Sequence, residues 1–208
     1  MNQFMFDVET LGVESSAVVL SMACIAFDFD EYSKYGNDPY EYYQVLLERA
    51  LFVKFQVKEQ FRSGRTSDKG TMEFWADQDP EARKKSFNPD ATRDVEAALG
   101  LKKLFWYTAT EMGVDSESSI VTIPQGYTFW QRGGLDQIML DSLCITSGVN
   151  KFINFWDWMD VRTMLAITKD TVVRGYATVP GFDFRNKVVK HDPVHDCAYD
   201  ILMMVAGK

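Results

Sequence analysis

The sequence predicts an α/β domain in which helices flank a mixed β-sheet. Strand-like apolar segments cluster early in the chain, and later segments alternate strand-like with helical patterns, which is typical of a layered α/β domain. The chain has 208 residues, 46% of them apolar or aromatic, so it can bury one sizeable core but has little room for a second. We therefore expect residues 1–208 to form a single domain.

The first predicted strand ends in two carboxylates. Side chains alternate along a strand, so Phe4, Phe6 and Val8 are expected on one face. Asp7 and Glu9 then share the other face, about 7 Å apart. Divalent cations such as Mg²⁺ prefer oxygen ligands, so this face could hold them. The residues alone are equally compatible with a polar strand end beside a turn.

A second, largely buried strand is predicted over residues 18–27, after a short connection that contains Gly12. The two strands are expected to form an antiparallel hairpin at the edge of a larger sheet. Residues 28–39 are acidic and rich in tyrosine and turn formers, which predicts a surface loop. A third strand is expected within residues 43–55, although residues 42–50 could equally form a helix.

Helices dominate the predicted middle of the chain. After a loop at residues 63–70, the expected helix starts are Thr71 as an N-cap, Asp79 followed by Pro80, and either Asp90 or Thr92. Apolar residues between positions 95 and 106 follow helical spacing, so the last of these helices is predicted to be the longest.

The rest of the chain alternates strand-like and helical segments. The expected order is strands at 120–124 and 126–131, a helix from Leu135, a strand at 152–155 and a helix at 161–167. Residues 171–192 contain glycine and proline without a sustained period, which predicts a long mobile loop of the kind that often carries function. The last helix is expected to begin with Asp192 as N-cap and Pro193 at its first position.

Charge and cysteine content exclude several classes of protein. A net charge of −8 argues against a protein that coats long duplex DNA, but not against a nuclease that grips a few nucleotides through metal ions. The basic residues within 54–69 and 83–85 are interpreted as solvated faces. Three widely spaced cysteines in apolar runs predict buried free thiols and a reducing cytoplasm. No segment has the pattern of a secretory signal or a membrane span.

The only two histidines lie in one acidic segment near the end of the chain. His191 and His195 are each followed by four residues and an aspartate, Asp196 and Asp200 respectively. On the final helix, His195 and Asp200 fall at opposite margins of the apolar stripe, where both could border a site at the edge of the core. A zinc site that also uses Cys197 is disfavoured, because a proline interrupts the helical turn between the histidines and no second ligand cluster occurs.

Three segments, taken in order, resemble the motifs of the DEDDh, or DnaQ-like, 3′-to-5′ exonucleases. They are Asp7-Val8-Glu9-Thr10 near the start, Asp136 within residues 131–136, and His195 followed by four residues and Asp200. The resemblance also extends over residues 71–75, 80–84, 155–156, 160–163 and 195–204, so it covers most of the chain. The ordered set is far more specific than any one of the motifs.

The resemblance implies a ribonuclease H-like fold, which is a mixed sheet flanked by helices. It also implies that Asp7, Glu9, Asp136 and Asp200 hold two divalent metal ions, Mg²⁺ or Mn²⁺, and that His195 is the general base. This is chemically reasonable, because a metal pair stabilises the charge that develops in phosphodiester hydrolysis and activates the attacking water. A histidine with a pKa near neutrality suits the role of a base.

The middle aspartate has two alternatives. Members of the family often carry an aromatic residue just before it, whereas this chain has Leu135 before Asp136. Asp141 and Asp160 are therefore also considered. Asp160 is better explained as a helix N-cap than as a metal ligand.

The histidine motif also has an alternative. His191 with Asp196 satisfies the same spacing as His195 with Asp200. His191 precedes the predicted cap of the last helix, and Asp196 would then occupy the first turn and leave Asp200 unexplained. The pair of His195 and Asp200 is preferred for this reason.

Candidate substrate contacts lie close to these motifs. Thr10, just past the opening acids, is expected to contact the 3′-terminal nucleotide. Phe182, Phe184 and Arg185 are expected to contact substrate, because their long loop immediately precedes the histidine motif. Phe74 and the tryptophans could stack on bases, although core packing explains most of these aromatic residues better.

The predicted activity is metal-dependent 3′-to-5′ hydrolysis of single-stranded DNA to 5′-mononucleotides. The alternative is an exoribonuclease of the same superfamily that acts on RNA ends, because sugar discrimination depends on a few contacts to the 2′-hydroxyl. A non-enzymatic binding module is disfavoured, since it would need neither Glu9 nor His195. The expected partner is a single-stranded nucleic acid with a free 3′ end, DNA ahead of RNA, and no membrane. The oligomeric state is open, with a homodimer among the options.

Overall fold

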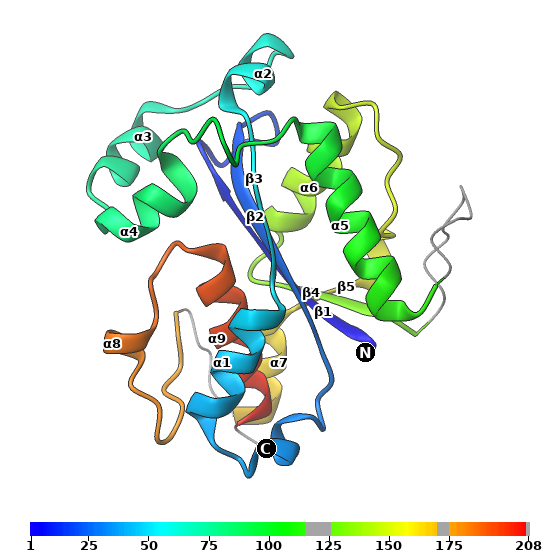
Figure 1. Ribbon diagram of the computed structural model, residues 1–208, viewed down its shortest axis with the longest axis vertical. Helices are drawn as coiled ribbons and strands as arrows, with labels where there is room; N and C mark the ends of the chain where they lie inside the picture. The colour runs from blue at the N-terminus through cyan, green and yellow to red at the C-terminus, as the bar shows by residue number, and fades with distance from the viewer. Residues whose placement is uncertain (115–125, 170–174, 207–208) are drawn as a thin grey trace.

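A five-stranded mixed β-sheet forms the centre of the computed structural model, which describes residues 1–114, 126–169 and 175–206 (Figure 1). The strands are β1 (Gln3–Thr10), β2 (Val19–Phe27), β3 (Leu51–Lys54), β4 (Thr128–Gln131) and β5 (Trp158–Asp160). Their order across the sheet is β3-β2-β1-β4-β5. β2 runs antiparallel to β1 and β3, whereas β4 is parallel to β1 and β5 is parallel to β4. This is the ribonuclease H-like fold that the sequence predicts.

β1 and β2 form the predicted antiparallel hairpin, but the hairpin lies inside the sheet. β3 pairs with the outer side of β2, and β4 pairs with β1. Every residue of β2 is buried. The prediction of an edge hairpin is therefore wrong, because a uniformly apolar segment belongs to a strand that is covered on both faces.

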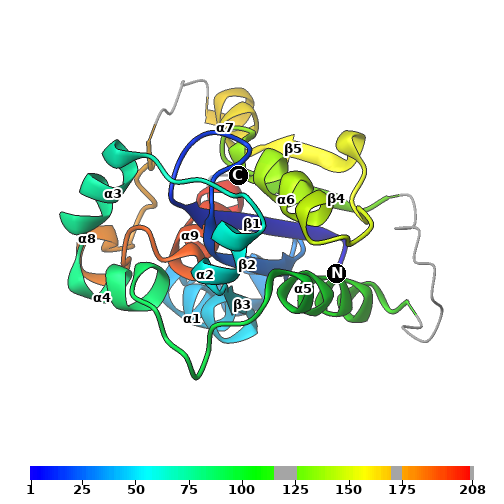
Figure 2. The same cartoon turned by 90° about the horizontal axis from the view of Figure 1, so that it is seen from above.

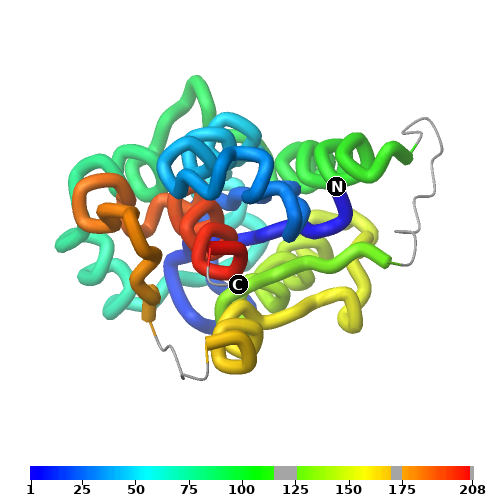
Figure 3. Tube along the Cα trace, turned by 90° about the horizontal axis from the view of Figure 1, so that it is seen from below, coloured from blue at the N-terminus to red at the C-terminus, as the bar shows by residue number. Residues whose placement is uncertain are grey.

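Helices cover both faces of the sheet. One face carries α1 (Pro39–Arg49), α7 (Val161–Lys169) and α9 (Pro193–Val205), and the other carries α5 (Ala97–Met112) and α6 (Leu135–Thr146) (Figure 1). Phe4, Phe6 and Val8 pack together on the α5 and α6 side, as predicted, while Met5 packs on the α9 side. The end of α9 lies between α1 and α7 (Figure 3). Every residue of α9 except His195 is consequently buried.

The segment predicted as a third strand is mostly helix. Asp38 caps the first turn of α1, and Pro39 occupies the first helical position, which is a strong helix start. Tyr42, Tyr43 and Leu46 are the buried residues of α1, and they fall on one helical face. The strand prediction is wrong over most of this segment, and the helical alternative is confirmed there. Only β3 at its end is a strand.

The chain between β3 and α5 forms a small helical region at one end of the sheet (Figures 1 and 2). It contains α2 (Val57–Arg62), α3 (Lys69–Ala76), α4 (Pro80–Ala82) and a π-helical turn (Arg83–Phe87). Asp79 caps α4 and Pro80 follows it, as predicted. Trp75 anchors the region to the sheet, because it packs in a buried cluster with Leu11, Val18 and Leu20.

Two predicted helix starts in this region are wrong. Asp68 caps α3, and its carboxylate accepts the backbone N–H of Thr71. Asp90 accepts the backbone N–H of Thr92, which closes a local turn instead of opening a helix. The long helix begins only at Ala97.

Most of the later alternation of strands and helices is confirmed. β4, α6 and α7 match the predicted segments, whereas residues 120–124 lie outside the described part of the chain. The strand expected at 152–155 is wrong: Phe155–Asp157 form a 3₁₀ turn, and β5 begins after it. The two predicted loops contain a 3₁₀ turn at Tyr32–Tyr35 and the short helix α8 (Phe184–Lys187), and residues 170–174 are not described. The last helix begins with Asp192 and Pro193, as predicted.

Two basic residues contradict the interpretation of residues 54–69 as a solvated face. Lys54 and Arg65 are each 3% exposed. The ammonium of Lys54 donates to the carbonyls of Lys84 and Asn88, and the guanidinium of Arg65 donates to the carbonyl of Ala17. These two cations tie loops together, so they are not available to a nucleic-acid backbone.

The cysteines are buried free thiols, as predicted, at Cys24, Cys144 and Cys197. Cys197 points its sulfur at the carbonyl of Ala23 inside the core. Across residues 1–114, 126–169 and 175–206, no helix combines the length and apolar character needed to cross a membrane.

Candidate active site

Two carboxylates project from the end of β1 towards α9. Asp7 and Glu9 alternate along the strand with Phe6 and Val8, which pack on the opposite face of the sheet. Both acids are partly buried, because β1 is a central strand covered by helices. The prediction that the two acids share one face is confirmed.

Asp136 reaches these acids from the first turn of α6. Gly133 and Gly134 precede the helix with φ values of +98° and +87°, a left-handed turn that glycine adopts readily. The carboxylate of Asp136 is buried, and its Oδ1 accepts the backbone N–H of Val8 at 3.2 Å. Since Val8 stands between Asp7 and Glu9, this hydrogen bond fixes Asp136 beside both.

The next carboxylate at this place is Asp196, in the first turn of α9. The candidate ligand atoms of Glu9, His191 and Asp196 all lie within 4.8 Å of one another. The backbone N–H of His191 donates to Oδ2 of Asp196 at 3.0 Å, and the hydroxyl of Tyr176 donates to Oδ1 at 2.5 Å. The structure therefore brings His191 and Asp196 to Glu9. Asp200 lies close enough for its charge to help raise the pKa of Asp7 and of Asp136.

His191 has an unusual backbone conformation just before α9. Its φ of +62° lies in the left-handed region, which is uncommon for residues other than glycine and concentrates at functional sites. Nδ1 of His191 lies 3.8 Å from Oε1 of Glu9. The ring packs edge-on against Phe74, with 4.9 Å between the ring centroids. The backbone conformation of His191 and the ring of Phe74 thus hold the imidazole beside Glu9.

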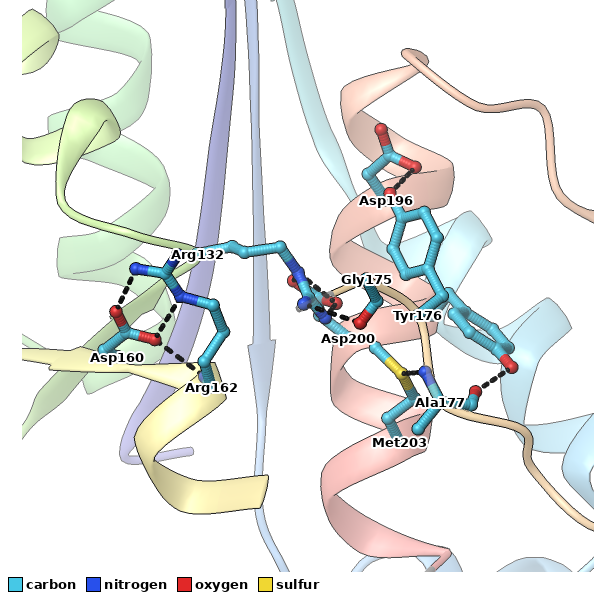
Figure 4. A network of polar contacts seen from close by, with 10 residues as sticks. Arg132, Asp160, Arg162, Gly175, Tyr176, Ala177, Asp196, Asp200 and Met203 are labelled. Atoms are coloured by element: carbon cyan, nitrogen blue, oxygen red, sulfur yellow. Dashed lines mark hydrogen bonds and ion pairs between the residues drawn. The ribbon is translucent and has the colours of Figure 1, made fainter. Parts of the chain in front are cut away.

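Asp200, the predicted fourth ligand, is bound by Arg132. Nε of Arg132 lies 3.2 and 3.1 Å from the two carboxylate oxygens, and Nη2 lies 2.5 Å from Oδ1 (Figure 4). Both side chains of this ion pair are largely buried. Asp200 therefore already has a cation of its own, whereas Asp196, one helical turn earlier, has none in the ion pairs among the described residues.

His195, the predicted base, lies on the α1 side of α9. Its Nδ1 is 2.8 Å from the hydroxyl of Tyr43, and its Nε2 is 3.9 Å from Oδ2 of Asp192. Asp192 also pairs with Lys85 at 3.1 Å. Margins of the apolar stripe do not mark an open site here, because α9 is covered on all sides. His195 faces α1, and Asp200 faces Arg132.

The two alternatives to Asp136 are bound elsewhere. Asp141 forms an ion pair with Lys151 at 2.8 Å. Asp160 pairs with Arg162 at 2.9 Å and accepts its backbone N–H at the start of α7 (Figure 4). The interpretation of Asp160 as a helix cap is confirmed.

Crowding of buried carboxylates raises their pKa values. Burial, followed by repulsion from neighbouring acids, holds the pKa of Asp7 and of Glu9 well above the ordinary range. Burial raises the pKa of Asp136 and of Asp196 to about 7, although backbone hydrogen bonds oppose the shift at both. Burial also lowers the pKa of His191, so its ring is neutral and free to accept a proton at pH 7.

The same residues fit a divalent metal site. Oδ2 of Asp7 is buried and has no hydrogen-bond partner among the described residues. An unsatisfied buried oxygen within a group of like charges is costly unless a cation neutralises it. Carboxylate oxygens are the ligands that Mg²⁺ and Mn²⁺ prefer. The geometry favours Asp7, Glu9, Asp136 and Asp196 as the ligand set.

A hollow of about 430 Å³ opens beside these acids, and Glu9, Thr10, Phe74 and His191 are among its lining residues. The hydroxyl of Thr10 donates to the carbonyl of Gly12 at 2.7 Å, so this side chain shapes the turn after β1. Phe74 is 41% exposed and presents an aromatic surface to the hollow. The size and lining suit a nucleotide. Thr10 lines the hollow but is only 9% exposed, so its contact with a nucleotide stays a prediction.

The other predicted substrate contacts divide between core and surface. Phe182 is 8% exposed and packs between Tyr43 and Tyr199, which argues against a direct substrate contact. Its place follows from the apolar groove between α1 and α9, which its ring fills. Phe184 is half-buried, whereas Arg185 is exposed. Both line a second hollow, of about 720 Å³, between α4 and the loop before α9.

Sequence reasoning missed Tyr176 and underrated His191 and Asp196. The two His-x4-Asp pairs have the same spacing, so spacing does not distinguish them. The choice depends on which turn of α9 lies beside the end of β1, and tertiary packing sets that turn. Tyr176 lies in an irregular loop, and no motif marks it.

Comparison with known proteins identifies the family of this chain. Residues 2–206 match the family of 3′-5′ exoribonuclease Rv2179c-like domains. The chain is also 31% identical over 228 aligned positions to the exodeoxyribonuclease of Enterobacteria phage T4, a match that covers 98% of this chain and 88% of the phage protein. The sequence motifs, the ribonuclease H-like sheet and both comparisons agree, and the chain belongs to the DEDDh-type 3′-to-5′ exonucleases, phosphodiester hydrolases that act on nucleic acid.

Proposed function

We propose that residues 1–208 form one exonuclease domain that degrades single-stranded DNA from its free 3′ end and releases 5′-mononucleotides. The observation that carries the proposal is the convergence of Glu9, His191 and Asp196 within 4.8 Å, beside Asp7 and its unpartnered buried oxygen. Burial and mutual repulsion raise the pKa of Asp7 and of Glu9. A module that only binds a ligand would not need such a cluster of buried acids, whereas perturbed pKa values are typical of active sites.

Asp7, Glu9, Asp136 and Asp196 would hold two Mg²⁺ or Mn²⁺ ions. When bound, such ions stabilise the charge that develops on the phosphate and lower the pKa of the attacking water. Asp196 replaces Asp200 in this assignment, because Arg132 already neutralises Asp200. The buried acids supply the negative charge that retains the ions.

His191 would be the general base in place of His195. Its lowered pKa leaves the imidazole neutral at neutral pH, with one ring nitrogen free of a proton, and the ring lies beside Glu9. A proton from the attacking water can be accepted there. His195 is tied to Tyr43 and the helix cap and lacks contact with the acids of β1.

The 3′-terminal nucleotide would occupy the hollow lined by Thr10 and Phe74. A base can stack on the exposed ring of Phe74, and stacking of this kind tolerates any sequence. Arg185, exposed beside the second hollow, is the proposed contact for the backbone of the preceding nucleotides.

DNA is proposed as the preferred substrate because the phage T4 relative, which matches along nearly the whole chain, is an exodeoxyribonuclease. RNA is the second candidate, because the family that the chain matches is described as exoribonuclease. The three buried free thiols suit a reducing cytoplasm as the place of action.

The test uses DNA and RNA oligonucleotides of one sequence, labelled at the 5′ end, with Mg²⁺, Mn²⁺ or EDTA. Metal-dependent shortening with 5′-mononucleotides among the products is expected, and DNA should be cleaved faster than RNA. Circular single-stranded DNA should resist, because it has no 3′ end. An Asp7→Asn variant purified in the same way controls for contaminating nucleases. Failure to shorten either linear substrate would refute the proposal, and faster cleavage of RNA would replace DNA with the second candidate.

A further inference from the structure

Two acids of α9, one helical turn apart, both reach the same short segment of the loop before α8. Asp196 accepts the hydroxyl of Tyr176 at 2.5 Å. Asp200 binds Arg132, and Nη1 of Arg132 donates to the carbonyl of Gly175 at 3.1 Å. Figure 4 shows both connections side by side along the helix. The segment from Gly175 to Tyr176 is thus fastened to α9 at two successive turns.

The aromatic ring of Tyr176 is held on several sides. Its centroid lies 5.0 Å from that of Phe184 and 5.5 Å from that of Tyr199. The guanidinium carbon of Arg132 lies over the ring at 5.1 Å. A hydroxyl on a ring fixed in this way has one place to point, and the ring points it at Asp196 (Figure 4).

Each oxygen of Asp196 receives one hydrogen bond from the protein. Tyr176 donates to Oδ1, and the backbone of His191 donates to Oδ2. An ionised carboxylate offers about four acceptor positions. Two donors therefore fix the plane of the carboxylate and leave acceptor capacity for a metal ion. Partners of this kind orient metal ligands and tune their affinity.

We propose that Tyr176 is a positioning residue that orients Asp196 for metal binding, and that the ion pair between Arg132 and Asp200 holds Tyr176 in place. The inference rests on the proposed function, because it takes Asp196 as a metal ligand. It also gives Asp200 a role: this buried acid acts through Arg132 and Tyr176 and has no direct contact with the metal.

Tyr199 offers a matched control on the same loop. Its hydroxyl donates to the carbonyl of Ala177 at 2.6 Å, so it also fastens the loop to α9, but it has no hydrogen bond to a candidate ligand. Replacement of either tyrosine by phenylalanine removes one hydroxyl and keeps the ring. If a looser loop alone weakens metal binding, Tyr176→Phe and Tyr199→Phe should both show the loss. If the orientation of Asp196 matters, only Tyr176→Phe should show it.

The experiment measures Mn²⁺ binding to the whole chain by isothermal titration calorimetry, without nucleic acid, together with the thermal midpoint. Tyr176→Phe should weaken Mn²⁺ binding by about 10-fold or more, the size expected for the loss of an outer partner of a metal ligand. Tyr199→Phe should bind Mn²⁺ as the wild type does. Asp200→Asn should weaken binding in the same direction as Tyr176→Phe but less.

Wild-type affinity in Tyr176→Phe, or equal losses in Tyr176→Phe and Tyr199→Phe, would overturn the positioning role while leaving the proposed function intact. A wild-type protein that binds no Mn²⁺ and shortens no nucleic acid would instead refute the proposed function, and the inference with it. The Mg²⁺ concentration needed for half-maximal cleavage gives a second reading: it should rise in Tyr176→Phe, and most of the rate should return at saturating Mg²⁺.

Discussion

The imidazole of His191 lies beside the carboxylate of Glu9, with 3.8 Å between Nδ1 and Oε1. Four residues later, His195 is less exposed and points at Tyr43 on α1. The two histidines of the chain thus lie on different sides of the start of α9, His191 beside β1 and His195 beside α1. Only His191 of these two lies beside an acid of β1.

His191→Ala should reduce the rate of cleavage by about 100-fold or more, the contribution expected from a general base. His195→Ala should retain most of the rate, because its ring contacts Tyr43 and Asp192 rather than the acids of β1. Its cost should appear in stability, at about 1 kcal/mol per hydrogen bond, because Nδ1 contacts both the hydroxyl of Tyr43 and the backbone N–H of Val189. Single-turnover rates at saturating Mg²⁺ and thermal midpoints provide the comparison. A dead His195→Ala beside an active His191→Ala would reverse the assignment.

The acids of α9 allow a second matched pair. Asp196→Asn should reduce cleavage by at least about 100-fold, as expected when electrostatic stabilisation of the reacting phosphate is lost. Asp200→Asn should keep a metal-dependent rate at saturating Mg²⁺, because Arg132 already neutralises Asp200. Asp7→Asn serves as the inactive reference. If Asp200→Asn were as inactive as Asp7→Asn and Asp196→Asn remained active, the fourth ligand would be Asp200.

Local patterns in the sequence were sufficient for the fold class and for three of the acids. Alternation along β1 placed Asp7 and Glu9 on one face, and the ordered motifs placed Asp136 at the start of a helix beside them. The alternation depends on neighbours in sequence, whereas Asp136, 128 residues from Val8, was placed only through the resemblance to the family. The sequence did not predict the strand order. The hairpin of β1 and β2 lies inside the sheet because β3 and β4 pair with its two sides, and β4 is distant in the chain.

The choice between the two histidine motifs could not be made from spacing. It depends on which turn of α9 meets the end of β1, and that is set by the packing of α1 and α7 around the helix. The left-handed conformation of His191 and the ion pair of Arg132 with Asp200 are likewise products of tertiary structure. The helical period of 3.6 residues shows which residues share one face of a helix. It does not show which part of the protein packs against that face.

Asp136→Asn should stabilise the metal-free protein at neutral pH. Burial raises the pKa of Asp136 to about 7, whereas an aspartate in an unfolded chain has a pKa of about 3.9. Between these values the folded state keeps a proton that the unfolded state has lost, so stability falls as pH rises through this window. Asparagine avoids this penalty and retains an oxygen for the N–H of Val8.

The measurement is thermal unfolding in EDTA at several pH values. At pH 7.5 the Tm of Asp136→Asn should exceed that of the wild type by several degrees, since about 1 kcal/mol shifts Tm by about 2–4 °C in a protein of this size. The difference should shrink towards pH 5, where the wild-type carboxyl is protonated. If the Tm difference between the variant and the wild type did not change with pH, the raised pKa of Asp136 would be contradicted. Mg²⁺ should raise the Tm of the wild type more than that of the variant.

Phe74→Ala should weaken substrate binding more than it slows the chemical step. Phe74 lines the hollow next to Glu9 and His191. Loss of one stacked base costs about 1–3 kcal/mol, so KM should rise by about 5-fold or more. Phe61, on α2, is similarly exposed, at 44% against 41%, and does not line this hollow, so Phe61→Ala is the control and should leave KM unchanged. Because Phe74 also packs on His191, a fall in kcat with an unchanged KM would mean that it acts by holding the imidazole. That outcome would contradict the stacking role, whereas a higher KM with a kcat close to that of the wild type would support it.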